Sequence, residues 1–201
     1  MVIRNLLTFL LCLILFSCAD RLDVISYSEV DIIRTSRDST YFKNGTLING
    51  LVKKIQDDKE ILSFSVKEGK IDGLYVEYYS SGSIKSLSNF KNGILDGKYS
   101  KFYENDLLME EFHYKNGLME GERILNWGNG NLKEKNFFKR GAMTRASEFY
   151  FSNGNPRKII SFDVNGRRDG EWIDYDSDGK LKLKVVYKSG IVLDSIIYQK
   201  Q

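Results

Sequence analysis

Short stretches of aromatic and aliphatic residues alternate with polar, glycine-bearing stretches along residues 41–198, and the alternation has an almost constant period. Intervals of 24, 24, 24, 24, 25 and 24 residues separate seven glycines, which are Gly45, Gly69, Gly93, Gly117, Gly141, Gly166 and Gly190. A fixed period of this length is typical of stacked supersecondary units, each packing against its neighbours. The sequence therefore predicts about seven stacked repeats of 24 residues.

Each unit carries two further turn positions. A second glycine follows the first by four residues at Gly73, Gly97, Gly121 and Gly170, whereas the fifth unit has Arg145 there. A dipeptide such as Asn153-Gly154 follows nine residues later, and Asp106 replaces its glycine once. Such dipeptides are typical of two-residue type I′ turns, in which both central residues have positive φ. Each unit is therefore expected to be a β-hairpin, with the geometry at Arg145 and Asp106 left open.

The predicted fold is all-β: an elongated antiparallel meander of about seven stacked 24-residue β-hairpin repeats. The glycines expected to shape it are Gly69, Gly73, Gly93, Gly97, Gly117, Gly121, Gly166 and Gly170. The first and last units depart from the pattern, as capping units of repeat arrays do. A single sheet cannot bury both of its faces, so it must curl, cross over itself or be covered by a partner.

Counting outward from each two-residue turn assigns the side chains to two faces. The largely apolar face has these predicted cross-strand pairs: Tyr79 with Ile84, Tyr103 with Leu108, Trp127 with Leu132, Tyr99 with Phe112, Phe151 with Pro156, Phe149 with Lys158, and Trp172 with Val185. On this face each second glycine lies opposite an aromatic residue, as Gly121 does opposite Phe138. A ring is therefore expected to cover bare backbone at each second glycine.

The opposite face combines aromatic and basic residues. Its predicted pairs are Tyr78 with Lys85, Tyr150 with Arg157, and Tyr175 with Lys182. Tyrosine and arginine often anchor protein interfaces. These six residues are therefore the candidate binding surface.

Three segments carry a family resemblance. The stretches Phe90 to Gly97, Tyr114 to Gly121 and Glu171 to Tyr175 resemble the MORN-repeat variant of bacterial proteins, with its aromatic-Lys-Asn-Gly phrase, second glycine and aromatic strand. The resemblance runs from about Tyr41 to Tyr198. It implies a scaffold for protein or lipid contact, and members are often labelled antitoxin-like. That label suits an exported protein poorly, so an immunity-like or scaffold role is the more consistent expectation.

The N-terminus has the shape of an export signal. Arg4 precedes the apolar run Leu6 to Phe16, which is shorter than the roughly 20 residues of a membrane-spanning helix. The run ends in Leu15-Phe16-Ser17-Cys18, which resembles a bacterial lipobox and implies that Cys18 is lipidated. The alternative is an ordinary secretory signal that contains a cysteine. The expected organisation is a lipoprotein signal peptide over 1–17, an anchor and tether over 18–40, and a repeat domain over 41–201.

Charge and residue types exclude several function classes. Removal of Arg4 with the signal lowers the formal charge from +3 to +2, which predicts no bulk attraction to nucleic acid. His113 is the single histidine, so a zinc site or a Ser-His-Asp relay is not expected. We therefore expect no enzyme activity and no cofactor.

One acidic motif resembles a calcium loop. Asp174, Asp176 and Asp178 precede Gly179 with the spacing of its opening half, but Val185 occupies the position of the closing glutamate. The repeat register assigns Asp178-Gly179 to a hairpin turn. The three aspartates are therefore only a weak metal candidate.

These observations predict a binding module at the cell envelope, anchored by lipid on the extracytoplasmic side of a membrane and contacting an unidentified protein partner. The alternative is a cell-wall or carbohydrate-binding repeat module, because aromatic-rich hairpin repeats also suit sugar stacking. The two interpretations differ in what the exposed rings contact.

The lipobox resemblance generates a direct prediction. Cys18→Ser should release the protein from membranes while the repeat domain stays folded, because the lipid and not the sheet is expected to hold the protein at the bilayer. Membrane fractionation with circular dichroism checks both parts. An unchanged membrane fraction for the variant would contradict the prediction.

Overall fold

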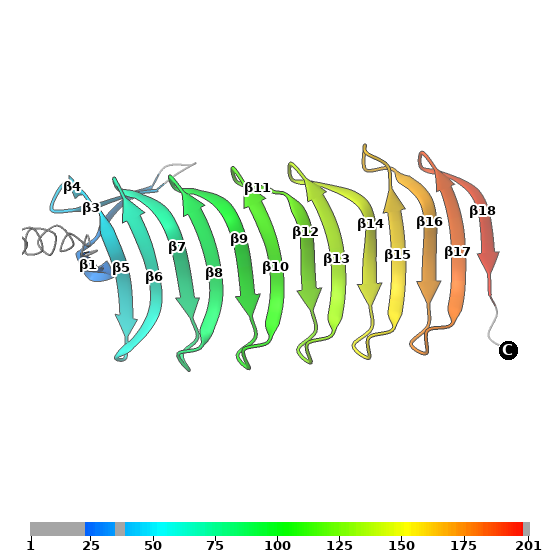
Figure 1. Cartoon of the computed structure of the whole chain (residues 1–201), viewed down its shortest axis with the longest axis horizontal. Coiled ribbons are helices and arrows are strands. Elements are labelled where there is room, and N and C mark those ends of the chain that lie inside the picture. The colour runs from blue at the N-terminus through cyan, green and yellow to red at the C-terminus, as the bar shows by residue number, and fades with distance from the viewer. Residues whose placement is uncertain (1–22, 35–38, 199–201) are drawn as a thin grey trace, which may run out of the picture.

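A computed structural model describes residues 23–34 and 39–198, which form one long sheet and one small sheet (Figure 1). In the long sheet the strands from β5 to β18 lie side by side in chain order without crossover, and β11 pairs beside this path with β10. All of these pairings are antiparallel. Among the described strands of this sheet, only β1 joins in parallel, against β5. The all-β meander of hairpin repeats is thus confirmed, and it forms a single layer.

The elements have the following bounds. The N-terminal elements are β1 (Val24–Ser26), the 3-10 helix η1 (Tyr27–Glu29), β2 (Asp31–Arg34), β3 (Ser39–Lys43) and β4 (Thr46–Leu47). The first repeats are β5 (Gly50–Gln56), β6 (Lys59–Lys67), β7 (Lys70–Tyr78), β8 (Ile84–Lys91), β9 (Ile94–Phe102), β10 (Leu108–Lys115) and β11 (Leu118–Met119). The last are β12 (Gly121–Asn126), β13 (Leu132–Lys139), β14 (Ala142–Tyr150), β15 (Pro156–Phe162), β16 (Arg168–Tyr175), β17 (Leu181–Lys188) and β18 (Ile191–Ile197).

The first glycine of each unit sits in the turn that joins one hairpin to the next. Asn92 and Gly93 both have positive φ, at 50° and 81°, as a two-residue type I′ turn requires. The Gly93 amide donates to the Ile71 carbonyl of the preceding unit at 2.7 Å, and the Asn92 amide donates to the Asp72 carboxylate at 2.9 Å. Along this margin of the sheet, such a turn is therefore hydrogen-bonded to a strand of the preceding unit.

The turns inside the hairpins differ from the prediction. At Asn153-Gly154 only Gly154 has positive φ, and the Phe151 amide donates to the Asn155 carbonyl across a three-residue loop. This is a turn closed by one left-handed residue, not a type I′ turn. Asp106, with φ of 62°, keeps the same conformation without glycine. The dipeptides predicted the turns correctly, but they did not distinguish the two turn types.

The longer loop shifts the strand register by one residue near each of these turns. Tyr78 pairs with Ile84 and Tyr150 with Pro156, so the predicted pairs of Tyr79, Tyr103, Trp127 and Phe151 are wrong. One extra residue on the returning strand then forms a bulge and restores the predicted register. Further out, the pairs confirmed are Tyr99 with Phe112, Phe149 with Lys158, Trp172 with Val185, and the four second glycines with their aromatic residues.

The second glycines serve a purpose other than the one predicted. Gly97 has φ of +114°, and a Cβ there would lie 3.0 Å from the Asn89 Cβ on the preceding strand. Gly121 has φ of +89°, and a Cβ there would meet nothing within 4 Å. The idea that a ring covers these glycines is therefore wrong. They occupy bulges where the backbone needs positive φ.

The hydrophobic core lies at the N-terminal end of the sheet. Its buried residues are Ile25, Tyr41, Ile48, Val52, Phe64, Val66 and Ile71. Residues 24–34, within the segment predicted as a tether, form β1, η1 and β2 here, and Ile25 is buried in this cluster. All residues of β18, at the other end, are exposed. The array therefore has one end closed by packing and one open strand edge.

Glycine substitutions test the bulge geometry. Gly97→Ala should destabilise the protein most, by about 1–3 kcal/mol, because it combines a strained φ with a contact to Asn89. Gly121→Ala should lower the free energy of unfolding by less, since it introduces backbone strain without a close contact. Gly128→Ala is the control, because Gly128 lacks positive φ and its nearest neighbour is 3.9 Å away. Urea titrations of the three variants measure the order, and equal losses for Gly97 and Gly128 would contradict it.

Candidate interaction surface

The six candidate binding residues occupy equivalent slots beside the three-residue loops, but they do not form the predicted pairs. Tyr78, Tyr150 and Tyr175 pair with apolar residues, namely Ile84, Pro156 and Leu181. Lys85, Arg157 and Lys182 are the bulged residues that no strand partner faces. The predicted pairs are displaced by one residue, because the sequence did not reveal the three-residue loop or the bulge that follows it.

Tyr78 and Lys85 nevertheless line one open hollow of about 430 Å³, beside the β5–β6 turn. The Tyr78 hydroxyl lies 3.5 Å from the buried Ser63 hydroxyl, which holds the ring half-buried. The Lys85 Nζ lies 3.9 Å from the Glu77 carboxylate. Both charged groups are partly exposed, so this ion pair is weak and remains open to a partner.

Arg157, Tyr175 and Lys182 line a second hollow of about 380 Å³. Asp174 contributes its carboxylate to the same wall, where it pairs with Lys158 at 3.2 Å. The hollow therefore offers a half-buried phenol and two exposed cations. The structure therefore brings these three predicted residues together in a second cluster.

Tyr150 lines neither of these two hollows. Its hydroxyl donates to the Glu148 carboxylate at 2.6 Å. This hydrogen bond, with partial burial, raises the pKa of Tyr150 to about 12. The six residues thus form two separate clusters and one isolated tyrosine, not a continuous column.

A ladder of side-chain hydrogen bonds runs along the hairpin loops, and the sequence interpretation missed it. The Tyr79 hydroxyl donates to the Phe102 carbonyl at 2.7 Å, and the Tyr103 hydroxyl donates to the Asn126 carbonyl at 2.8 Å. Trp127 continues the series through its indole N–H, at 3.2 Å from the Tyr150 carbonyl. Each of these groups joins its unit to the next, which accounts for polar aromatics in this slot.

The other face carries two groups of packed rings. In the first group, the ring centres of Phe64 and Tyr75 lie 5.5 Å apart, and those of Tyr99 and Phe112 lie 4.7 Å apart. In the second group, near the C-terminal end of the sheet, the ring centres of Trp172 and Tyr187 lie 5.1 Å apart. Between the two groups, Arg123 and Ser147 fill the slots that Tyr75, Tyr99 and Trp172 fill elsewhere. The row of rings is therefore interrupted in the fourth and fifth units.

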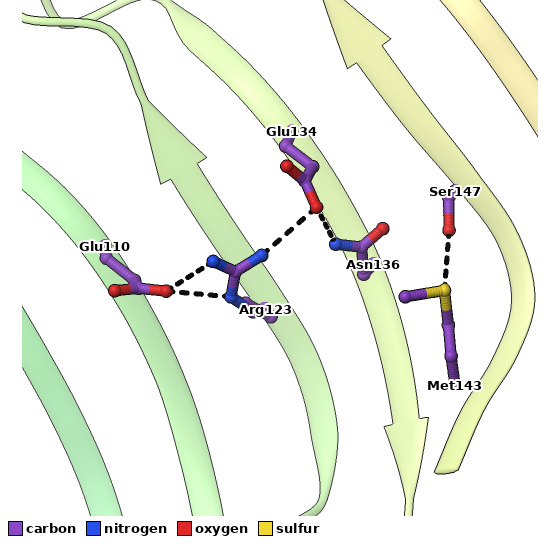
Figure 2. A network of polar contacts seen from close by, with 6 residues as sticks. All are labelled: Glu110, Arg123, Glu134, Asn136, Met143 and Ser147. Atoms are coloured by element: carbon purple, nitrogen blue, oxygen red, sulfur yellow. Dashed lines mark hydrogen bonds and ion pairs between the residues drawn. The ribbon is translucent and has the colours of Figure 1, made fainter. Parts of the chain in front are cut away.

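Polar contacts replace the rings at this interruption (Figure 2). The Arg123 guanidinium donates to Glu110 at 2.8 Å through Nε and to Glu134 at 3.1 Å through Nη1. Asn136 is fully buried and donates to the same Glu134 oxygen. Within the part of the chain that the structure describes, the Asn136 Oδ1 atom has no hydrogen-bond partner. An unsatisfied buried acceptor of this kind is costly, so this stretch of the face is locally destabilised.

The structure does not gather the three aspartates of the weak metal candidate into a ligand group. Asp176 accepts the backbone amides of Asp178 and Lys180 in its own loop, and Asp174 is paired with Lys158. Residues 23–34 and 39–198 contain no group of three His, Cys, Asp or Glu side chains placed to hold a metal ion. Over the same residues, no helix is long and apolar enough to cross a bilayer. Cys18 lies outside the described residues.

Comparison with known families identifies three of the repeats. Residues 71–92, 95–116 and 168–189 match the family model described as the MORN repeat variant. These segments coincide with the hairpins β7–β8, β9–β10 and β16–β17. The fourth and fifth units, which hold Arg123 and Ser147, lie between the matched segments. No curated protein matches the chain.

The environment of Tyr150 predicts a pH dependence. A tyrosine in the unfolded chain has a pKa of about 10, whereas the pKa of Tyr150 in the folded chain is about 12. The folded state therefore holds a proton that the unfolded state releases, so this contribution to stability is complete below pH 10 and disappears as the pH rises to about 12. Tyr150→Phe should lose less stability than the parent protein across that range. Urea titrations at stepwise pH measure this, and identical profiles would contradict it.

Proposed function

We propose that this protein is an interaction scaffold that presents its single-layered sheet to a protein partner at the surface of a membrane. The observation that carries the proposal is the open sheet itself. From β5 to β18 it runs as one layer, and among the residues that the structure describes, only those at its N-terminal end add other elements that pack on it (Figure 1). Both faces therefore remain accessible over most of the array. Extended open surfaces of this kind are what repeat proteins use for binding.

Two clusters are the contact points on this scaffold. One contains Tyr78 and Lys85, and the other contains Arg157, Tyr175 and Lys182. Half-buried tyrosines beside exposed or partly exposed cations combine apolar contact with charge recognition, as in many interface hot spots. They lie in the second and the fifth to sixth units, so a single partner that contacts both must span the sheet.

Lipid attachment at Cys18 gives the scaffold its place on the extracytoplasmic side of the envelope. Residue 24 begins β1 at the packed end of the sheet, so an anchor joined there holds the sheet by that end (Figure 1). The exposed strand β18 then lies farthest from the anchor along the array. An immunity-like role is compatible with this arrangement, because it also needs an accessible binding surface outside the membrane.

The carbohydrate-binding alternative has less support. Sugar stacking uses open aromatic faces, but a cation already covers one face of each tryptophan ring. The Lys133 Nζ lies 4.4 Å from the centre of the Trp127 ring, and the Arg168 guanidinium lies 4.1 Å from that of Trp172. Both indole N–H groups also donate to backbone carbonyls.

Tyrosine substitutions test the scaffold surface. Tyr78→Ser together with Tyr175→Ser should abolish cross-linking to the partner in intact cells, because each change removes the ring from one cluster. Tyr150→Ser removes an equivalent ring that lines neither cluster and should leave cross-linking unchanged. Mass spectrometry of the cross-linked material gives the readout, and circular dichroism checks the fold. Equal losses for Tyr150→Ser and the double variant would refute the assignment.

A further inference from the structure

Four departures from the repeat coincide in the fifth unit. The first is Arg145, which has φ of 66° where Gly73, Gly97, Gly121 and Gly170 stand in other units. A residue with a side chain is strained in this conformation. Arg145 therefore carries backbone strain that the glycines at this position of the other units do not.

The second and third departures concern the turn that follows. Thr144 replaces the acidic residue that elsewhere accepts an amide of the next turn, as Asp72 and Asp169 do. The single interval of 25 residues, from Gly141 to Gly166, ends in this turn. The Gly166 amide donates to the Asp163 carbonyl within the same loop. The equivalent amides of Gly93, Gly117, Gly141 and Gly190 donate to the preceding unit instead. The bonds that bind this margin elsewhere are replaced by local ones here.

The fourth departure is a shortened strand ladder. The β7–β8 ladder continues to the pair Gly73–Phe90, but the β14–β15 ladder stops at Ser147–Ile160. Two further pairs, which would include Arg145 with Phe162, are not formed. Ser147 also lacks the ring that Trp172 provides against Tyr187 in the sixth unit. The facing edges of β14 and β15 are therefore without a ladder partner at this end.

An open hollow of about 910 Å³ lies where these strands part. Phe137, Phe138 and Phe162 supply apolar walls, and Val164, which is 90% exposed, also lines the hollow. The acidic groups in the walls are already engaged, as Glu122 is with Lys135 at 2.9 Å and Asp169 with Lys188 at 3.4 Å.

Two cations in the same hollow remain available. Within the described residues, neither Lys139 nor Arg145 forms an ion pair with a carboxylate. The Arg145 guanidinium lies 5.4 Å from the centre of the Phe137 ring. The hollow therefore combines aromatic surface with two cations that lack a carboxylate partner, although four carboxylates also line it.

We propose that this hollow binds an extended peptide segment of a partner protein, in which an acidic side chain lies next to an apolar one. The proposal rests on the scaffold function above and gives it a specific site. The carboxylate pairs with Arg145 and Lys139, and the apolar side chain packs on the phenylalanines. The peptide backbone supplies hydrogen-bond partners to the residues of β14 and β15 that lie beyond the last ladder pair, Ser147–Ile160. A lipid headgroup has the anion but not the regular backbone partners, so the open edges favour a peptide.

Arg145→Gly separates binding from stability. It restores the residue that other units have, so it should relieve backbone strain and raise the melting temperature by roughly 2–4 °C. It should also weaken peptide binding by about tenfold or more, because a charge-assisted contact is lost. Arg140→Gly is the matched control: it removes an arginine whose φ is also positive, at 50°, from the preceding turn. It should relieve similar strain and leave binding unchanged.

The probe is a phage-displayed library of random heptapeptides, selected on the purified repeat protein, followed by fluorescence anisotropy with the selected peptides. The expected result is enrichment of an aspartate or glutamate beside an aromatic or aliphatic residue, with binding lost in Arg145→Gly and kept in Arg140→Gly. Failure to enrich such peptides, or equal binding by both variants, overturns the site. Binding to anionic vesicles that Arg145→Gly abolishes, without peptide enrichment, overturns it in favour of lipid.

Failure of this site and failure of the scaffold function give different results. If peptides or the cellular partner bind Arg145→Gly normally but not the Tyr78→Ser, Tyr175→Ser variant, the scaffold function stands and this site is wrong. The opposite result is that peptides with an acidic residue beside an apolar one bind only when Arg145 is present, while the Tyr78→Ser, Tyr175→Ser variant cross-links normally. In that case the hollow is the contact point and the tyrosine clusters are not.

Discussion

Hydrogen bonds between consecutive repeats hold this molecule together, because a single-layered sheet has no second layer on which to pack. At one margin the Gly93 amide binds the Ile71 carbonyl, and at the other the Tyr79 hydroxyl binds the Phe102 carbonyl. Both contacts join a unit only to its neighbour, so stability is a sum of nearest-neighbour terms. The buried cluster around Val52 and Phe64 closes one end of this series. The glycine period follows from the same constraint, since each turn must present its amide in the same place.

The period of the glycines was sufficient to predict the fold, since few architectures repeat turn residues every 24 positions. Turn type was not predictable in the same way. Asn-Gly occurs both in the type I′ turn at Asn92-Gly93 and in the three-residue loop at Asn153-Gly154, where only the glycine has positive φ. The dipeptide supplies the left-handed glycine in both cases, and the number of residues around it decides the loop. The single 25-residue interval was the visible sign that loop length varies.

The candidate surface could be predicted only in part, for a related reason. A bulge after each loop corrects the register, so pairs such as Tyr99 with Phe112 were counted correctly, while Tyr78 and Lys85 were paired wrongly. Unlike the bulges at the second glycines, the bulges after the loops contain no glycine, which hides them in a sequence. The polar interruption at Arg123 and Asn136 was equally hidden. It becomes visible only when the correct register places these residues in slots that hold rings elsewhere.

Within the described residues, the fourth and fifth units combine three costs: a buried Asn136 acceptor without a partner, a strained Arg145 and a shortened β14–β15 ladder. In a nearest-neighbour array such costs stay local, so intact hairpins on both sides can support a weak unit between them. The weak unit also reduces the coupling between the two halves. On our proposal, a bound peptide supplies the missing strand contacts and the missing carboxylate at this point. Binding would then restore coupling across the array, so the partner would rigidify the scaffold that it binds.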